Sequence, residues 1–250
     1  MIRLALAVIW LAFPVLAEKV VVGLSQNRVA ITANFVGSEI LIFGAVKREE
    51  PIPAGRLDVV ISVQGPLAPL TVSRKERRYG IWINVDEVQI DAAPSFYAVA
   101  TTGPLPGVLS ATEDLRYKVS VPRAIRSVGA PASVPDAQAF SEALIRLRTA
   151  SGQYVLREGA VELTEDTLFR ARIALPANLT EGSYTARIFL TRGGRVVDQL
   201  ATRIVVRKEG LERFLFALAH QQPVIYGMLS LTIAIVAGWA ASTVFRYFKA

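Results

Sequence analysis

The sequence predicts a mainly β protein, with immunoglobulin-like antiparallel β-sandwich modules, a helical segment between them and one C-terminal transmembrane helix. Three observations favour this class. Stretches rich in β-branched residues alternate with period two over residues 19–102 and resume at Tyr154. A helical periodicity lies between them, near residues 136–148. Residues 224–245 carry no charged side chain, and a helix of this length is long enough to span a bilayer.

Residues 1–17 have the pattern of a secretory signal peptide. Arg3 supplies a positive start, residues 4–13 are uninterruptedly apolar, and small residues at Val15 and Ala17 precede a cleavage site before Glu18. Ten apolar residues reach about 15 Å as a helix, against a hydrocarbon core of about 30 Å. Export with cleavage is therefore expected, and an uncleaved N-terminal anchor is the alternative.

Residues 18–107 are expected to form a first, periplasmic β-sandwich module. Pro and Gly turns separate short apolar stretches at intervals near ten residues, which is typical of antiparallel sandwiches. We expect Trp82 and Tyr97 in its core, because strand aromatics are generally buried. The candidate strands are 20–24, 29–34, 40–43, 57–63, 81–83 and 96–99.

Residues 108–208 are expected to hold the helical segment and then a second sandwich-like module. Phe140, Ala143, Leu144 and Leu147 share one helical face. Gly193-Gly194 favours a type I′ hairpin turn, because both central residues of that turn need positive φ. The candidate strands are 168–175, 184–190 and 196–206. One larger sandwich with a helical insertion is the alternative to two modules.

The C-terminal region predicts a membrane anchor of type I topology. Residues 223–245 form the span, and Arg246 and Lys249 place a tail, 246–250, in the cytoplasm by the positive-inside rule. A buried core helix is the alternative interpretation, disfavoured by the length and the flanking charges. With an exported N-terminus, the protein is expected in the bacterial inner membrane with its body in the periplasm.

A short amphipathic helix is expected in the juxtamembrane range 209–222. Leu211, Phe214, Leu215 and Leu218 recur on one helical face, so the helix could lie on the outer leaflet or continue into the span at Pro223. His220, the single histidine, is expected to be an interfacial polar residue, and a pH sensor is the alternative.

Composition argues against an enzyme, a metal site and a cofactor. The 250 residues include no cysteine and one histidine, which excludes thiolate nucleophiles and nearly excludes His-based triads and multi-His metal sites. Acidic pairs such as Asp86-Glu87 are adjacent, and adjacent strand residues point to opposite faces. Range 18–222 carries a net charge of only +4, which does not suggest nucleic acid as a partner.

Two surface patterns remain as candidate interaction sites. Arg74, Lys75, Arg77 and Arg78 could hold an anionic ligand, a lipid headgroup or an acidic partner, and a solvated hairpin tip or edge strand is the plain alternative. The second pattern is a small-residue face in the span, which would let another helix approach closely, either a multi-span protein or a second copy. Its residues are Ser230, Ala234, Gly238 and Ser242.

Several stretches together resemble a known family, the alphaproteobacterial putative transmembrane proteins of unknown function. These are Val22-Gly23-Leu24-Ser25, residues 35–45, Gly80-Ile81-Trp82-Ile83-Asn84, residues 94–101, Leu175-Pro176-Ala177-Asn178 and residues 237–242. The resemblance covers essentially the whole mature chain. It implies a single-span inner-membrane protein with a periplasmic body, and, from the family's association with genes for sulfite-exporter-like permeases, an accessory role. It assigns no functional residue.

The leading hypothesis is therefore a non-enzymatic membrane protein that binds a partner, such as an anion permease. The alternative is a periplasmic sensor or binding module for a small anion, using Arg74, Lys75, Arg77 and Arg78.

Overall fold

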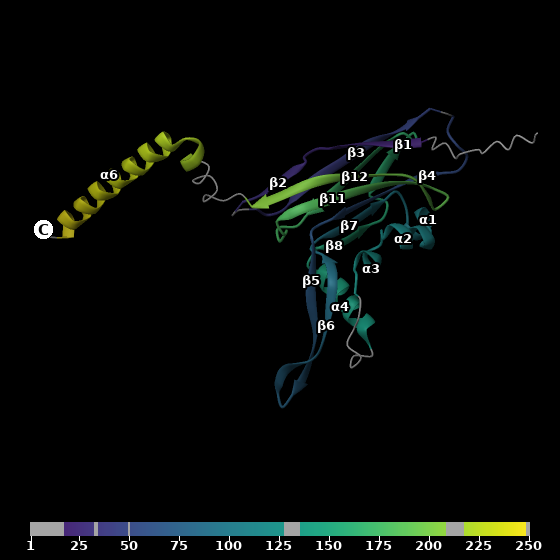
Figure 1. Cartoon of the computed structure of the whole chain (residues 1–250), viewed down its shortest axis with the longest axis horizontal. Coiled ribbons are helices and arrows are strands. Elements are labelled where there is room, and N and C mark those ends of the chain that lie inside the picture. The colour runs from purple at the N-terminus through teal and green to yellow at the C-terminus, as the bar shows by residue number, and fades with distance from the viewer. Residues whose placement is uncertain (1–17, 33–34, 50, 128–135, 209–217, 249–250) are drawn as a thin grey trace, which may run out of the picture.

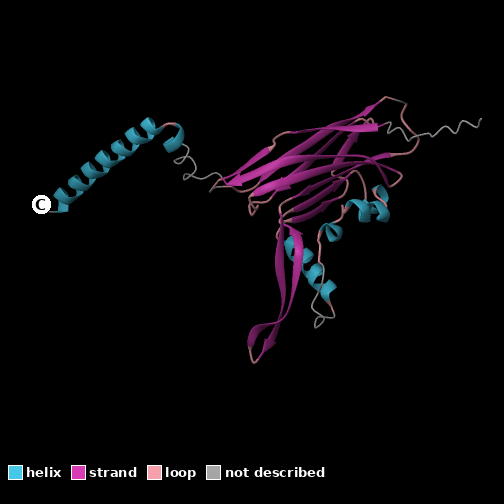
Figure 2. Cartoon of the chain, viewed as in Figure 1, coloured by secondary structure: helices cyan, strands magenta, loops and turns pink. Residues whose placement is uncertain are grey.

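The computed structural model describes residues 18–32, 35–49, 51–127, 136–208 and 218–248. The predicted signal peptide, residues 1–17, and most of the predicted juxtamembrane helix lie outside the described residues. Figure 2 shows that strands dominate the body, with a few short helices beside them. The mainly β class predicted from the sequence is confirmed, together with one C-terminal apolar helix.

A four-stranded antiparallel sheet forms one layer, in the order β1-β3-β10-β9. Its strands are β1 (Glu18–Leu24), β3 (Ser38–Arg48), β9 (Val161–Thr164) and β10 (Leu168–Leu175). Strand β10 shows the expected alternation, because Phe169 and Ile173 are buried while Arg170 and Arg172 face solvent. Arg170 there pairs with Glu162 of β9 at 2.6 Å.

A six-stranded sheet forms the second layer, in the order β2-β12-β11-β4-β7-β8. Its strands are β2 (Arg28–Ile31), β4 (Leu57–Gln64), β7 (Tyr97–Thr101), β8 (Tyr154–Arg157), β11 (Gly182–Arg192) and β12 (Arg195–Lys208). The turn between β11 and β12 is the predicted one, since Gly193 and Gly194 have φ of 57° and 76°.

The hydrophobic core lies between these two sheets, which Figure 1 shows stacked face to face. The four-stranded sheet contributes Ile40, Ile42, Phe169 and Ile173, and the six-stranded sheet contributes Val59, Ile61, Ile188 and Ile204. Alternate residues of a strand point to opposite faces, so each strand gives one row of side chains to this core.

Both ranges that were expected as separate modules contribute strands to both sheets. Strand β10 pairs with β3, and β11 pairs with β4, so sequence-distant strands are direct neighbours. The body is one β-sandwich with a helical insertion, rather than two modules in succession. The physical reason is that the four strands from residues 18–64 leave apolar faces and open edges that the strands after residue 160 help to cover, with β10 beside β3 and β11 beside β4.

Short helices cover the outer face of the six-stranded sheet. They are α1 (Leu105–Val108), α2 (Ala111–Tyr117) and α3 (Val121–Ala124). Val108 and Val119 pack there against Val60, Tyr97 and Phe189. Residues 57–63 of β4 are consequently buried on both faces, unlike an ordinary sandwich strand.

Two further elements leave the sandwich. Strands β5 (Leu67–Arg78) and β6 (Ile81–Pro94) form a separate two-stranded hairpin, and α4 (Ala137–Ala150) lies along its base (Figure 1). The position of α4 agrees with the helix predicted near residues 136–148.

Helix α6 (Pro223–Phe248) begins at the predicted start of the span. Its segment Pro223–Ser242 is long and apolar enough to cross a membrane, with a mean hydropathy of 1.9, and none of it is buried against the body. A buried core helix is therefore not what this segment forms. Proline suits the first helical turn, because its missing N–H is not needed there.

Candidate functional site: the aromatic and basic hairpin

The β5–β6 hairpin is long and ends in a tight turn. Its strands pair antiparallel from Leu67 opposite Pro94 to Arg78 opposite Ile81. Tyr79 and Gly80 form the turn with φ of 50° and 87°, the two positive values that a type I′ turn requires. Strand β5 is not among the candidate strands, because its charged half, residues 73–78, carries no apolar alternation. The alternative considered for these cations, a solvated hairpin tip or edge strand, agrees with their position here.

Helix α4 braces the hairpin at its base. Phe140 packs on Val88 and Val72, and Leu144 packs on Ile90. The Arg74 guanidinium lies 4.8 Å from the centre of the Phe140 ring, within cation–π range. Packing against a helix gives a two-stranded ribbon the support that it lacks alone.

The tip beyond this brace presents large apolar side chains to solvent. Tyr79 is fully exposed, Ile81 is 65% exposed and Trp82 is 67% exposed. The expectation that Trp82 belongs to the core is therefore wrong, whereas Tyr97 is fully buried as expected. Trp82 is exposed, unlike Tyr97, because no other described helix or sheet packs on the hairpin at this point. Periodicity reports which face a side chain shares, but not whether anything covers that face.

The four predicted cations all lie on this hairpin, in two different states. Arg74 is 3.6 Å from Asp86 and 3.3 Å from Asp136, and Arg78 is 2.9 Å from Glu76. Lys75 and Arg77 form no ion pair among the described residues.

Arg77 and Trp82 are cross-strand partners in the register. Lys75 lies on the same face as Arg77, because alternate strand residues share a face. The hairpin thus carries two unpaired cations and a tryptophan on one face near its tip.

A groove of about 420 Å³ lies between the hairpin and α4, beside the residues through which they pack. Arg74, Lys75 and Arg146 line it together with Phe140 and Leu147. The Arg74–Phe140 contact forms part of its wall.

A second groove, of about 380 Å³, lies where α2 and α3 meet the six-stranded sheet and contains four cations but no carboxylate among its lining residues. They are Lys118, Arg123, Arg126 and Arg187. Arg187 is fixed by donating to the Tyr117 carbonyl at 2.7 Å and to the Tyr97 hydroxyl at 3.0 Å. Burial raises the pKa of Tyr97, although the Arg187 charge opposes that rise. Four cations without a carboxylate form a setting that favours a small anion. Sequence analysis did not identify this groove, because its cations are scattered along the chain.

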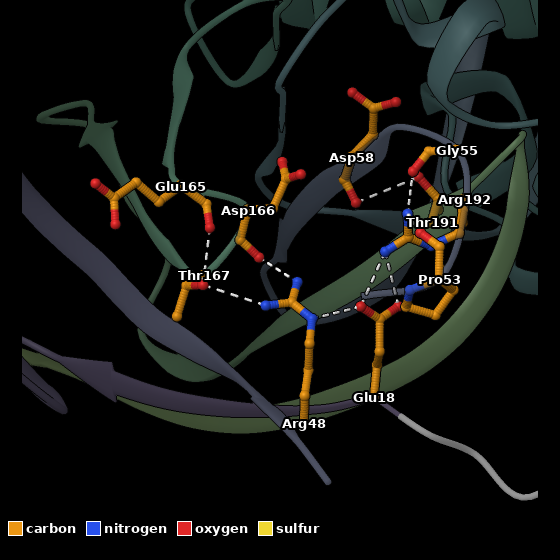
Figure 3. A network of polar contacts seen from close by, with 10 residues as sticks. All are labelled: Glu18, Arg48, Pro53, Gly55, Asp58, Glu165, Asp166, Thr167, Thr191 and Arg192. Carbon is orange, nitrogen blue, oxygen red and sulfur yellow. Dashed lines mark hydrogen bonds and ion pairs between the residues drawn. The ribbon is translucent and has the colours of Figure 1, made fainter. Parts of the chain in front are cut away.

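A buried ion cluster closes the end of the sandwich where β1 begins (Figure 3). The Glu18 carboxylate accepts from Arg48 at 2.7 Å and from Arg192 at 2.9 and 3.1 Å. Both guanidiniums also donate to backbone carbonyls, Arg48 to Asp166 and Arg192 to Gly55. These contacts join β1, β3 and β11, so the cluster serves the fold.

Among the described residues, no group of three or more His, Cys, Asp or Glu side chains could hold a metal ion. His220 is exposed next to the start of α6.

The small-residue face predicted in the span is fully exposed on α6. Ser230, Ala234, Gly238 and Ser242 lie four residues apart along it, and nothing lies within 4 Å of the point where a Gly238 side chain would begin. The Ser230 hydroxyl donates to the Gly227 carbonyl of its own helix at 2.9 Å. That bond leaves the face without an outward polar donor at Ser230.

Comparisons with known proteins place the chain by its sequence. A search of curated proteins finds no match. Among solved structures, the crystal structure of the sporulation control protein Spo0M from Bacillus subtilis is similar to this chain, with 12% sequence identity and a TM-score of 0.26. The similarity covers 77% of this chain and 50% of that one, so this chain spans about half the length of that protein. The sequence profile of a family described as "Putative transmembrane protein (Alph_Pro_TM)" matches residues 19–247. Because that match covers nearly the whole chain, the protein belongs to this transmembrane family.

Proposed function

We propose that this protein is a non-enzymatic accessory subunit that docks on a multi-span membrane protein through its span. The anion permeases of the sulfite-exporter type are the expected partner class. Its body would lie in the periplasm, with a type I span in the inner membrane and the signal peptide removed.

The observation that carries this proposal is that the described side chains of α6 are exposed. All of its described side chains from Pro223 to Ser242 are exposed, so the body covers none of them. Lipid tails are as apolar as leucine, and helices in a bilayer therefore associate through close packing rather than hydrophobicity. The face with Ala234 and Gly238 offers that packing, because small side chains let two backbones approach closely.

The test replaces Gly238 by Leu on the full chain, followed by crosslinking in cells and purification in mild detergent. We expect partner recovery to fall at least tenfold, because the larger side chain separates the helices. Ala240→Leu is the matched control, since residue 240 lies about 200° around the helix from residue 238. Equal recovery from both variants would contradict the docking role, and recovery of a second copy alone would replace the permease by self-association.

A second candidate function is the binding of a small anion. The observation that favours it is the groove of Lys118, Arg123, Arg126 and Arg187, which has no carboxylate in its lining. The hairpin cations are less suited, because Arg74 and Arg78 are already paired with carboxylates.

A further inference from the structure

We propose that the tip of the β5–β6 hairpin, residues 75–82, binds the headgroup region of an anionic lipid bilayer. The inference goes beyond the proposed docking of the span and does not depend on it.

The exposed side chains of the tip have the chemistry of a membrane-interface segment. Tyr79, Ile81 and Trp82 are each at least 65% exposed at the end of a protruding ribbon. Tyrosine and tryptophan favour the membrane–water interface, because their rings are apolar on one side and polar on the other. An aliphatic side chain beside them adds buried apolar area when the tip enters the interface.

The tip carries a net positive charge. Lys75 and Arg77 are unpaired among the described residues, and Arg78 neutralises Glu76, the only acidic side chain in residues 75–82. Anionic headgroups attract basic residues within about a Debye length of the surface. No uncompensated carboxylate of the tip therefore repels such a surface.

The outermost aromatic side chain and the cations lie at different distances from the end of the hairpin. Tyr79 forms the turn, while Arg77 and Lys75 lie about 7 and 13 Å behind it at the usual strand rise of about 3.3 Å per residue. A bilayer has the same order, with phosphates outside the acyl chains. Trp82 lies level with Arg77, its cross-strand partner. An acidic protein surface would favour unpaired cations at the outermost position, where this hairpin places the ring of Tyr79.

The hairpin extends well beyond the helix that supports its base. The bracing contacts reach as far as Arg74, which lies on the Phe140 ring and pairs with Asp136, so the ribbon runs about 17 Å further to Tyr79. Among the described residues, no third strand or helix lies beside that distal part. A span in the same chain also holds the tip near a membrane, and tethering makes a weak site effective.

The test uses Trp82 as its own reporter in the full chain. Trp10 and Trp239 are replaced by Phe, and the protein is reconstituted into bilayers whose acyl chains carry bromine, a quencher of tryptophan fluorescence. We expect at least twofold stronger quenching in phosphatidylglycerol than in phosphatidylcholine, and a loss of that difference in Lys75→Gln/Arg77→Gln.

A matched control places the reporter on the outer face of the four-stranded sheet, as Leu168→Trp with Trp82→Phe, since Leu168 is 57% exposed. Quenching of Trp82 above this control in phosphatidylglycerol supports the proposal. Quenching no greater than the control would overturn it. Loss of a co-purified protein in Trp82→Ala, with Trp82 unquenched by lipid, would also overturn it and assign the tip to a protein contact.

Discussion

Glu18 is the residue whose replacement tests the structure most directly. Its side chain is 4% exposed, and those of Arg48 and Arg192 are 10% exposed. Glu18→Gln keeps the shape of the side chain but removes the negative charge between two buried guanidiniums. Strand β1 begins at this residue, which is also the first residue after the predicted signal cleavage site.

The expected loss of stability follows from these contacts. Removing one partner of a buried ion pair costs about 3–5 kcal/mol, because the remaining charge is left uncompensated. Both arginines keep bonds to carbonyls, Arg48 to Asp166 and Arg192 to Pro53 and Gly55. We therefore expect the lower end of that range, about 3 kcal/mol. For a body of this size, this corresponds to a melting temperature lower by about 6–12 °C.

The assay is urea unfolding of the full chain in detergent, read by the protection of the body from proteolysis. Glu49→Gln is the matched control, because Glu49 pairs with Lys47 while 77% exposed. Exposed pairs contribute at most about 1 kcal/mol, and this one is expected near zero. A loss below about 1 kcal/mol for Glu18→Gln would refute the argument that the cluster holds β1 in place.

Two further predictions concern alkaline pH and the cationic groove. Burial raises the pKa of Tyr154 to about 12, so the folded state keeps a proton that the unfolded state loses near pH 10. Stability should thus be complete below pH 10 and fall by about 2 kcal/mol towards pH 12 in alkaline unfolding curves; an unchanged slope in Tyr154→Phe would contradict this cause. In the groove, calorimetric titration with inorganic phosphate should show binding about tenfold weaker in Arg123→Gln/Arg126→Gln, with Arg170→Gln unchanged. Phosphate binding that persists undiminished in the double variant would exclude the groove as the anion site.

The hairpin shows where sequence reasoning stops. Residues 73–78 gave a charge cluster without periodicity, and Ile81 and Trp82 resembled a core strand. Only the structure pairs these segments, at Arg77 opposite Trp82, and shows that no other described element covers them. The four predicted cations likewise differ in their pairing, because the carboxylates that neutralise Arg74 come from β6 and from Asp136 before α4.

What the sequence by itself determined is what short-range pattern encodes. This includes the strands with period two, the helix near residues 136–148, the Gly193-Gly194 turn and the uncharged span, because each depends on neighbouring residues alone. Only the tertiary structure decided that residues 18–64 and 161–208 build one sandwich, that Glu18 meets Arg192, and that Trp82 is exposed. These depend on which distant faces bury each other, and that is a property of the whole chain rather than of any segment.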